Sequence, residues 1–284
     1  MNKTLCIYHA NCADGFGAAW VVRKALGEQN VDFYAASYQE EPPAVAGRDV
    51  LIVDFSYKRP VMEQIAAEAN SVLVLDHHES AERELTPLLE SGLIKGTFSE
   101  DNSGVMLAWQ HFFPDQYPLH LIASIEDRDL YQFQHADTKD LMAAVFSYPM
   151  EFPVWDQLLE NTSLRSLQTE GKGIRRKQEK DTRDLIDNNA FRTTIAGYDV
   201  PVLNAPYIYA SEAGNIMAEG EPFAAIFQIT GNGRKYSLRS SKEGGANVSE
   251  IAELFGGGGH KNAAGFELED IDLLYIAKSE GLPR

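Results

Sequence analysis

Apolar residues in the first 130 positions form short runs that are separated by segments with helical spacing. The runs at residues 5–9, 50–54 and 72–75 have the length of buried strands, and turn residues bound them. The segments at 15–26 and 59–69 repeat apolar residues every three or four positions, which predicts amphipathic helices. Buried strands that alternate with such helices indicate a parallel sheet with helices on both faces.

The second half of the chain has a different pattern. Residues 163–189 are polar, compatible with a helix, and mix acidic with basic side chains as a solvated connecting helix does. Beyond them, apolar runs predict strands at residues 191–196, 200–203, 223–229 and 235–239, and helical spacing recurs at 213–218 and 248–255. We therefore expect an α/β protein with a first domain of residues 1–162, a linker helix of residues 163–190 and a smaller mixed α/β domain of residues 191–284.

The composition is that of a soluble globular protein, with 284 residues of which 44% are hydrophobic and 24% charged. The apolar stretch near the N-terminus is too short for a signal peptide, and no segment approaches the length of a membrane span. Cys6 and Cys12 are the only cysteines, so the sequence offers no disulfide framework. We expect a cytoplasmic protein that has no membrane contact.

The net charge of −17 argues against a general binder of long duplex DNA, because such binding depends on many Lys and Arg contacts to phosphates. Basic residues nevertheless gather in one segment of the second half, where they outnumber the acidic ones: Arg234, Lys235, Arg239, Lys242 and Lys261. A local basic patch on an acidic chain suits a small anionic ligand better than a polymer. Whether the chain is a monomer or a homodimer stays open.

Four consecutive glycines, at positions 256–259, lead directly into His260 and Lys261. Backbone without side chains can bring its N–H groups close to an anion. The histidine and lysine add charge where a phosphate would lie. An ordinary glycine-rich turn is the alternative interpretation of this loop taken alone.

Polar residues follow the predicted strands of the first domain at the ends where ligands bind in parallel sheets. His9, Asp54 and Asp76 occupy three such ends, and four further candidate ligands join them: Asp14, His77, His78 and Asp127. Singly, each has another explanation, such as a helix cap for Asp14 or a solvated charge run for Asp127 and Asp129. Together, carboxylates at one sheet edge repel unless a cation neutralises them, and oxygen-rich sites with histidine suit Mn²⁺ or Mg²⁺.

Three motifs occur in order along the chain: His9 followed by Asp14-Gly15, the triplet Asp76-His77-His78 after an apolar run, and the Gly-Gly-Gly-His loop that ends at His260. Together they resemble those of the DHH/DHHA1 phosphoesterases, a family that includes RecJ exonucleases, nano-RNases and cyclic-dinucleotide phosphodiesterases. The resemblance implies a catalytic, metal-binding DHH domain in residues 1–162 and a substrate-binding DHHA1 domain in residues 191–284.

The resemblance also implies residue roles. The DHH motifs would hold two Mn²⁺ ions through His9, Cys12, Asp14, Asp54, His77 and Asp127, with Asp129 as the second choice for the last position. Asp76 would orient the nucleophilic water, and His78 would contact the scissile phosphate. In the DHHA1 domain the substrate phosphate would be bound by Arg239, Ser240, Gly257, Gly258, Gly259, His260 and Lys261, among which Arg239 and His260 would also assist catalysis.

Cys12 departs from the family pattern, which has an aspartate at this position. A thiolate is a soft ligand that matches Mn²⁺ poorly and zinc better, so Co²⁺ and Zn²⁺ join Mg²⁺ as alternatives to Mn²⁺. Four interpretations stay open: Cys12 binds metal, Asn11 substitutes through its carbonyl, the first metal binds partly through water, or Cys12 makes no metal contact.

The resemblance predicts a metal-dependent phosphodiesterase that hydrolyses short oligonucleotides or linear dinucleotides, such as pGpG, to mononucleotides. Two metals can activate water and clamp a phosphate for in-line attack. Three alternatives stay open: a phosphomonoesterase acting on 3′-phosphoadenosine 5′-phosphate, a cyclic-dinucleotide phosphodiesterase, and an inactive nucleotide-binding regulator. A family II inorganic pyrophosphatase shares the Asp-His-His motif, but the glycine loop argues against it.

Overall fold

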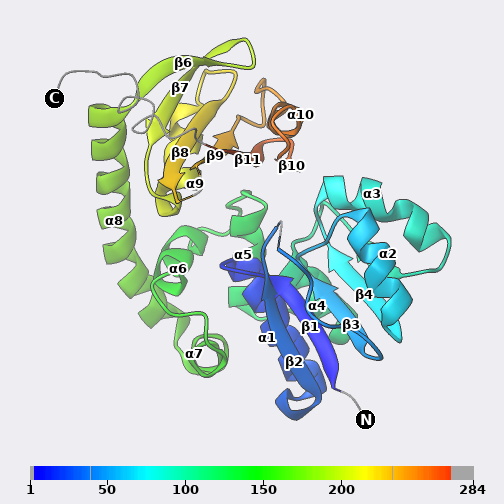
Figure 1. The fold of residues 1–284 in the computed structure, drawn as a ribbon. Helices are drawn as coiled ribbons and strands as arrows, with labels where there is room; N and C mark the ends of the chain where they lie inside the picture. The colour runs from blue at the N-terminus through cyan, green and yellow to red at the C-terminus, as the bar shows by residue number, and fades with distance from the viewer. Residues whose placement is uncertain (1–2, 39, 232, 270–284) are drawn as a thin grey trace. The chain divides into compact units, whose positions relative to one another are not determined.

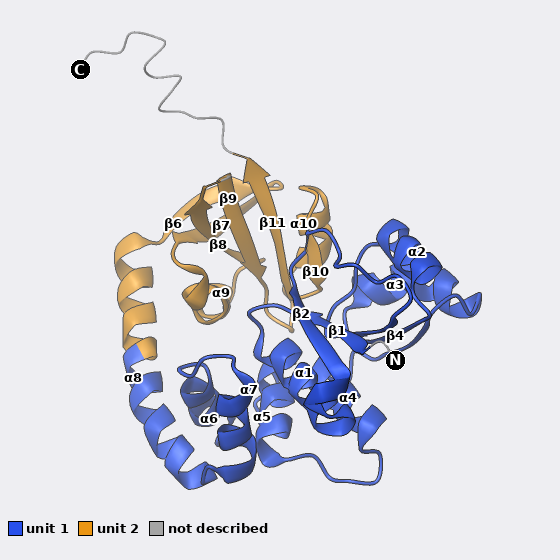
Figure 2. Cartoon of the chain, turned by 60° about the horizontal axis from the view of Figure 1, so that its bottom comes forward, with its two compact units in different colours: residues 1–177 blue, residues 178–284 orange. Residues whose placement is uncertain are grey.

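The computed structural model describes residues 3–38, 40–231 and 233–269. These residues belong to two compact units, which are divided between Lys177 and Gln178 (Figure 2). Residues 270–284 of the predicted second domain lie outside the described residues, as do residues 1–2 of the predicted first domain. The predicted linker at 163–190 corresponds to helix α8 (Leu164–Asn189), and the division between the units falls within this helix.

The first unit is built on a five-stranded sheet in the order β2-β1-β3-β4-β5, in which every pairing is parallel (Figure 1). Its strands are β1 (Thr4–His9), β2 (Val31–Ala36), β3 (Asp49–Val53), β4 (Ser71–Asp76) and β5 (Lys95–Phe98). The predicted parallel sheet is confirmed, with β1, β3 and β4 at the three predicted positions. The strands β2 and β5, at the two edges of the sheet, were not predicted from the sequence.

Alternating side chains of the strands enter two separate cores, one on each face of the sheet. In β3, Leu51 and Val53 pack with helices α1 (Ala13–Leu26) and α4 (Gly104–Phe112). Val50 and Ile52 point the other way and pack with α2 (Arg59–Glu68) and α3 (Glu79–Glu90). Because both faces are covered, the central strands β1, β3 and β4 have mostly apolar sequences that do not alternate between apolar and polar residues.

Further helices complete the first unit on the side of α1 and α4. They are α5 (His120–Asp129), α6 (Thr138–Val145), α7 (Phe152–Asp156), a π-helical turn (Gln157–Asn161) and the first part of α8, and a 3₁₀ turn (Glu28–Asn30) precedes β2. Trp155 of α7 is buried in the same core as Trp20 of α1. The segment 137–162 therefore contributes side chains to this core.

The second unit has a six-stranded sheet in the order β10-β11-β9-β8-β7-β6, antiparallel except for the β7–β8 pair. Its strands are β6 (Phe191–Ile195), β7 (Tyr198–Asn204), β8 (Ala224–Thr230), β9 (Gly233–Arg239), β10 (Gly258–His260) and β11 (Ala263–Glu269). Its helices are α9 (Ala210–Met217), α10 (Val248–Glu253) and the 3₁₀ turn Tyr207–Tyr209. The predicted mixed α/β architecture of the second half is confirmed.

No helix in the described part of the chain combines the length and the apolar character that crossing a membrane requires.

Candidate metal centre

The sheet of the first unit brings three polar residues to the carboxyl ends of neighbouring strands. His9 ends β1, Asp54 follows β3, and Asp76 ends β4. Asp54 has a φ of 52°, a left-handed conformation that is uncommon outside glycine, and its N–H donates to Leu75 O at 2.9 Å. This turn leaves the Asp54 side chain buried at the strand edge, with 1% of its surface exposed.

Asp14 reaches the same edge through the turn that links β1 to α1. A side chain at Gly15 would put its Cβ 2.4 Å from His9 O, so glycine allows the helix to begin directly against the strand end. The Asp14 carboxylate accepts hydrogen bonds from the N–H groups of Gly104 (2.6 Å) and Val105 (2.9 Å) at the start of α4. Asp14 thus interacts with the N-terminus of a different helix and does not cap its own, whose N-cap residue is Cys12.

Three groups of side chains at this edge each offer ligand atoms within 4.8 Å of one another: His9 with Cys12 and Asp54, Asp14 with His77 and Asp129, and Asp54 with Asp76 and His78. Asp54 also joins the first two groups, because its Oδ1 lies 3.2 Å from His77 Nε2 while its Oδ2 lies 3.4 Å from His9 Nδ1. His77 Nε2 is in addition 3.5 Å from Asp129 Oδ2. A carboxylate between two ligand groups allows two divalent ions to be held close together.

The donor atoms fit divalent cations. Asp14, Asp54 and Asp76 are almost completely buried within one small region, and buried carboxylates that converge in this way need a positive charge between them. Asp54 Oδ2 makes no hydrogen bond to any described residue, although it is buried. An unsatisfied carboxylate oxygen at the centre of the group is available for a metal ion.

Burial and neighbouring charges shift the pKa values of two of these side chains in opposite senses relative to the charge they carry. Burial raises the pKa of Asp14 well above its ordinary value, and the neighbouring Asp54 and Asp129 raise it further. Burial also opposes the charged form of His77, but the hydrogen bond to Asp54 and the charges of Asp129, Asp54 and Asp14 outweigh it and raise the His77 pKa to about 10. A protonated His77 therefore supplies positive charge in the metal-free site, and a metal ion must displace that proton.

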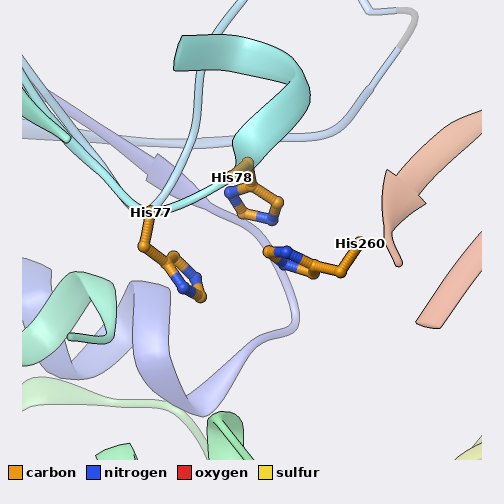
Figure 3. A group of neighbouring side chains, drawn as sticks. All are labelled: His77, His78 and His260. Atoms are coloured by element: carbon orange, nitrogen blue, oxygen red, sulfur yellow. The ribbon is translucent and has the colours of Figure 1, made fainter. Parts of the chain in front are cut away.

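Asp76 fixes the orientation of His78. Its Oδ1 lies 2.6 Å from His78 Nδ1 and accepts the N–H of His77 at 2.8 Å, while its Oδ2 accepts the Ser56 hydroxyl at 2.6 Å. His77 and His78 project from the segment between β4 and α3, with ring centroids 4.7 Å apart (Figure 3). Both oxygens of Asp76 thus have partners within the protein, and its expected role in orienting a water stays a prediction.

Asp127 and Asp129 lie on different sides of α5. The Asp127 carboxylate accepts the N–H of Gln134 (2.7 Å), the N–H of His135 (3.1 Å) and the hydroxyl of Thr138 (2.5 Å), and so holds the loop that follows the helix. Asp129 is the residue whose carboxylate lies beside His77. The geometry therefore favours Asp129, the second choice from the sequence, over Asp127 as a ligand.

Arg239, predicted to bind phosphate, lies at the end of β9 in the second unit and is held by α9. Its Nη2 donates to Ser211 Oγ at 2.9 Å, and its Nη1 donates to the carbonyl of Leu238 at 2.8 Å. A Cβ at Gly214 would lie 2.7 Å from Arg239 Cγ, so this glycine lets α9 pack against the arginine stem. Next to Arg239, the buried Ser240 accepts a hydrogen bond at 2.9 Å from the side chain of Asn262, which lies in the β10–β11 turn.

The glycine loop is required by close backbone packing. The N–H groups of Gly256 and Gly257 donate to Glu253 O and Ala252 O and so complete the end of α10. A Cβ at Gly257 would lie 2.0 Å from Gly265 O, and Gly259 has a φ of 145° with Ala263 O only 2.6 Å from where its Cβ would lie. Gly258 has open space around it, and β10 continues through it to His260 and the turn at Lys261. Two N–H groups expected to face an anion are therefore used by the fold, and the phosphate-binding role of this loop stays a prediction.

Sequence reasoning missed Ser56, Gly104 and Ser211, which act on site residues without carrying charge. For Gly104 a signal existed, because Ser103-Gly104 before an apolar helical stretch is a typical helix start. A Cβ at Gly104 would lie 2.4 Å from Asp54 Cβ and 2.8 Å from Asp14 Oδ2, so glycine is needed where α4 meets the centre. Ser56 and Ser211 have no distinguishing sequence pattern.

Comparisons with known proteins agree with this architecture. The DHHA1 domain family matches residues 208–279. An uncharacterised protein of Acanthamoeba polyphaga mimivirus, R106, is 29% identical over 292 residues, which cover 93% of this chain and 67% of that protein. Two solved structures share the fold, each covering 98% of this chain. They are RecJ from Thermus thermophilus in complex with Mn²⁺ (TM-score 0.53, 15% identity, 51% of that chain) and the pGpG-specific phosphodiesterase PggH from Vibrio cholerae (TM-score 0.51, 14% identity, 97% of that chain).

Proposed function

We propose that this chain, which belongs to the DHH/DHHA1 family of phosphoesterases, hydrolyses the phosphodiester bonds of short oligonucleotides or linear dinucleotides such as pGpG to mononucleotides. One observation carries the proposal: Asp54, buried and with one oxygen unsatisfied, stands between two groups of metal-ligand side chains at the edge of the sheet. The fold shared with RecJ and with a pGpG-specific phosphodiesterase supports a phosphodiester substrate.

We propose His9, Cys12, Asp14, Asp54, His77 and Asp129 as the metal ligands, with Asp129 replacing Asp127. Divalent ions held there would activate a water nucleophile at neutral pH and offset the charge of the phosphate. Mn²⁺ is the ion we propose for catalysis at the group Asp14, His77 and Asp129, on the grounds that carboxylates and histidine suit it and that the RecJ structure of similar fold contains it.

His78 is the residue proposed to contact the scissile phosphate. Burial opposes its charged form, but the charge and hydrogen bond of Asp76 outweigh burial and raise the pKa of His78 above its ordinary value. A protonated imidazole held by Asp76 can donate to a phosphate oxygen and stabilise the negative charge that develops in the transition state. Asp76 acts through His78 in this scheme.

The second unit is proposed to bind the substrate's phosphate. Arg239 offers a guanidinium that Ser211 has already oriented, and His260 and Lys261 lie at the β10–β11 turn that Asn262 joins to Ser240. A preordered arginine loses little conformational entropy on binding an anion, and its planar group matches phosphate geometry. Ser240 and the glycines 257–259 shape the backbone around this turn.

The test is a panel of 5′-phosphorylated RNAs from two to ten nucleotides, together with pGpG, a cyclic dinucleotide and 3′-phosphoadenosine 5′-phosphate, read by product length and by phosphate release. With Mn²⁺ we expect mononucleotides from the shortest linear substrates, and no turnover after chelation.

Asp54→Asn should lower the rate by about 100-fold or more. Asp115→Asn, at an exposed position of the same unit, is the matched control. Release of phosphate from the monoester alone would replace the proposal by a phosphomonoesterase, and absence of any turnover with Mn²⁺ would refute a phosphoesterase.

A further inference from the structure

We infer that His9, Cys12 and Asp54 form a mixed nitrogen, sulfur and oxygen subsite, in which the Cys12 thiolate binds the metal directly and selects Zn²⁺ or Co²⁺ over Mn²⁺ and Mg²⁺. The inference deepens the proposed function, since it assigns a metal class to one half of the same centre. The two ligand groups of the centre then differ in chemistry, because the other group offers only oxygen and nitrogen donors, from Asp14, His77 and Asp129.

The distances within the group suit a small cation. Metal–ligand bonds of about 2.3 Å to sulfur and about 2.0–2.2 Å to nitrogen or oxygen place neighbouring ligands about 3.3–3.6 Å apart in a tetrahedron. His9 Nδ1 and Asp54 Oδ2 are already 3.4 Å apart. The Cys12 sulfur lies within 4.8 Å of a ligand atom of each, so the three side chains surround one position that a cation can occupy.

A second observation points to a ligand at this position independently of the cysteine. The oxygen of Asp54 that faces His9 is the one without a hydrogen-bond partner among the described residues, and Asp54 is 1% exposed. Leaving a buried carboxylate oxygen unsatisfied is costly unless a cation binds it. The same oxygen is the natural third ligand of a metal held by His9 and Cys12.

The local backbone presents the thiol to this position. Asn11 has a φ of 54°, which turns the chain sharply after β1, and Cys12 follows as the N-cap residue of α1. The carbonyl of Cys12 accepts the N–H of Phe16 at 3.0 Å and so begins the helix. Burial and the charges of Asp54, Asp129 and Asp14 raise the pKa of the Cys12 thiol well above its ordinary value, so a metal ion must displace the thiol proton when the sulfur binds it. Cys6, the other cysteine, is fully buried in the core and cannot compete for the ion.

The softness of the donor decides the preferred metal. Thiolate strengthens binding of zinc and cobalt far more than of manganese or magnesium, which prefer oxygen ligands. An aspartate at the same position would favour the harder ions. The residue at position 12 is thus inferred to determine which metal occupies the first subsite.

The experiment uses the full chain, freed of metal with a chelator and titrated with Co²⁺, whose thiolate complexes absorb in the near ultraviolet by sulfur-to-metal charge transfer. We expect this band in the wild-type protein and in the control Cys6→Ala, and its absence in Cys12→Ser and Cys12→Asp. Calorimetric titration should show Zn²⁺ affinity falling by about 10- to 100-fold in Cys12→Asp while Mn²⁺ affinity rises. Circular dichroism checks that each variant is folded. If Cys12→Ser does not fold, the comparison is made with Cys12→Asp alone.

The outcomes separate this inference from the proposed function. A band that depends on Cys12, without hydrolysis of any nucleotide, would support the subsite and refute the enzyme. Hydrolysis with Mn²⁺, together with identical metal titrations of wild type and Cys12→Ser and no charge-transfer band, would refute the subsite and leave the enzyme standing.

Discussion

Asp127 and Asp129 are two residues apart on α5 and therefore point in different directions, since successive helical residues are rotated by about 100°. Asp127 accepts three hydrogen bonds from residues 134–138, and these outweigh the effect of burial and lower its pKa. Asp129 faces His77 and accepts no comparable set of bonds in the described residues. The two carboxylates therefore have separable roles, one in stability and one in metal binding.

We expect Asp129→Asn to weaken Mn²⁺ binding by at least about 10-fold and to leave the stability of the metal-free protein nearly unchanged. Asp127→Asn should lower the free energy of unfolding by about 1–2 kcal/mol, because charge-assisted hydrogen bonds to the loop are weakened, and should change Mn²⁺ affinity little. Urea denaturation in chelator and calorimetric metal titration measure the two effects. The reverse result, with metal affinity lost only in Asp127→Asn, would return Asp127 to the metal centre.

Among the elements, α8 shows how a single glycine can fix the packing of a helix. A Cβ at Gly171 would lie 1.7 Å from the carbonyl oxygen of Asp140 in α6, so the two helices touch through backbone. A Cβ at Gly173, in the same helix, would have no other atom within 4 Å. The same residue type is therefore required at one position and replaceable at the other.

Gly171→Ala should destabilise the protein by about 1–3 kcal/mol, because the helices must move apart to admit a methyl group. Gly173→Ala should stabilise it by about 0.5–1 kcal/mol, the gain expected when alanine replaces glycine inside a helix where the added methyl group meets no other atom. Thermal unfolding of both variants beside the wild type checks the opposite signs. Equal shifts in the two variants would show that the α6–α8 contact does not limit stability.

At the scale of the whole molecule, a chain of net charge −17 gathers several carboxylates at one sheet edge. The metal-free protein compensates by raising the pKa of His77 to about 10 from its ordinary value of 6.5. A group whose pKa is raised by folding contributes its stability fully below the unfolded value, and the contribution is lost as the pH rises through the folded value. The metal-free protein should therefore lose stability from pH 6.5 towards pH 10.

We expect this loss to reach at most about 1.4 kcal/mol per pH unit for the one proton concerned. A metal ion at 100 times its Kd should add about 2.7 kcal/mol and should flatten the dependence, because it replaces the proton on His77. Unfolding midpoints measured against pH in chelator and in Mn²⁺ test both statements, and His77→Asn in chelator should have the shallower slope. A slope of the same steepness in His77→Asn would assign the effect to other groups.

The sequence by itself determined the central strands of the first sheet and the carboxylate and imidazole side chains that follow them. Continuous apolar runs such as Val50 to Val53 predict strands covered on both faces because burial on two sides leaves no place for polar residues. Polar residues directly after such runs reach the ligand-binding edge of any parallel sheet. The edge strands β2 and β5 gave weaker patterns, with exposed and intermediate residues through most of their length, and were missed.

Only the tertiary structure decided which of the candidate ligands and glycines come into contact with the metal centre or with another backbone. Asp129 lies beside His77, whereas Asp127 binds the loop after α5, and both contacts join residues that the packed fold brings together. Gly257 and Gly259 are required by the approach of β11, and Gly104 by the approach of α4 to Asp54. Ser103 before Gly104 marks a helix start, but it does not reveal the contact with Asp54. The periodicity of apolar residues along the sequence indicates which side chains are buried. Contacts between backbone segments far apart in the chain form only when the whole domain packs.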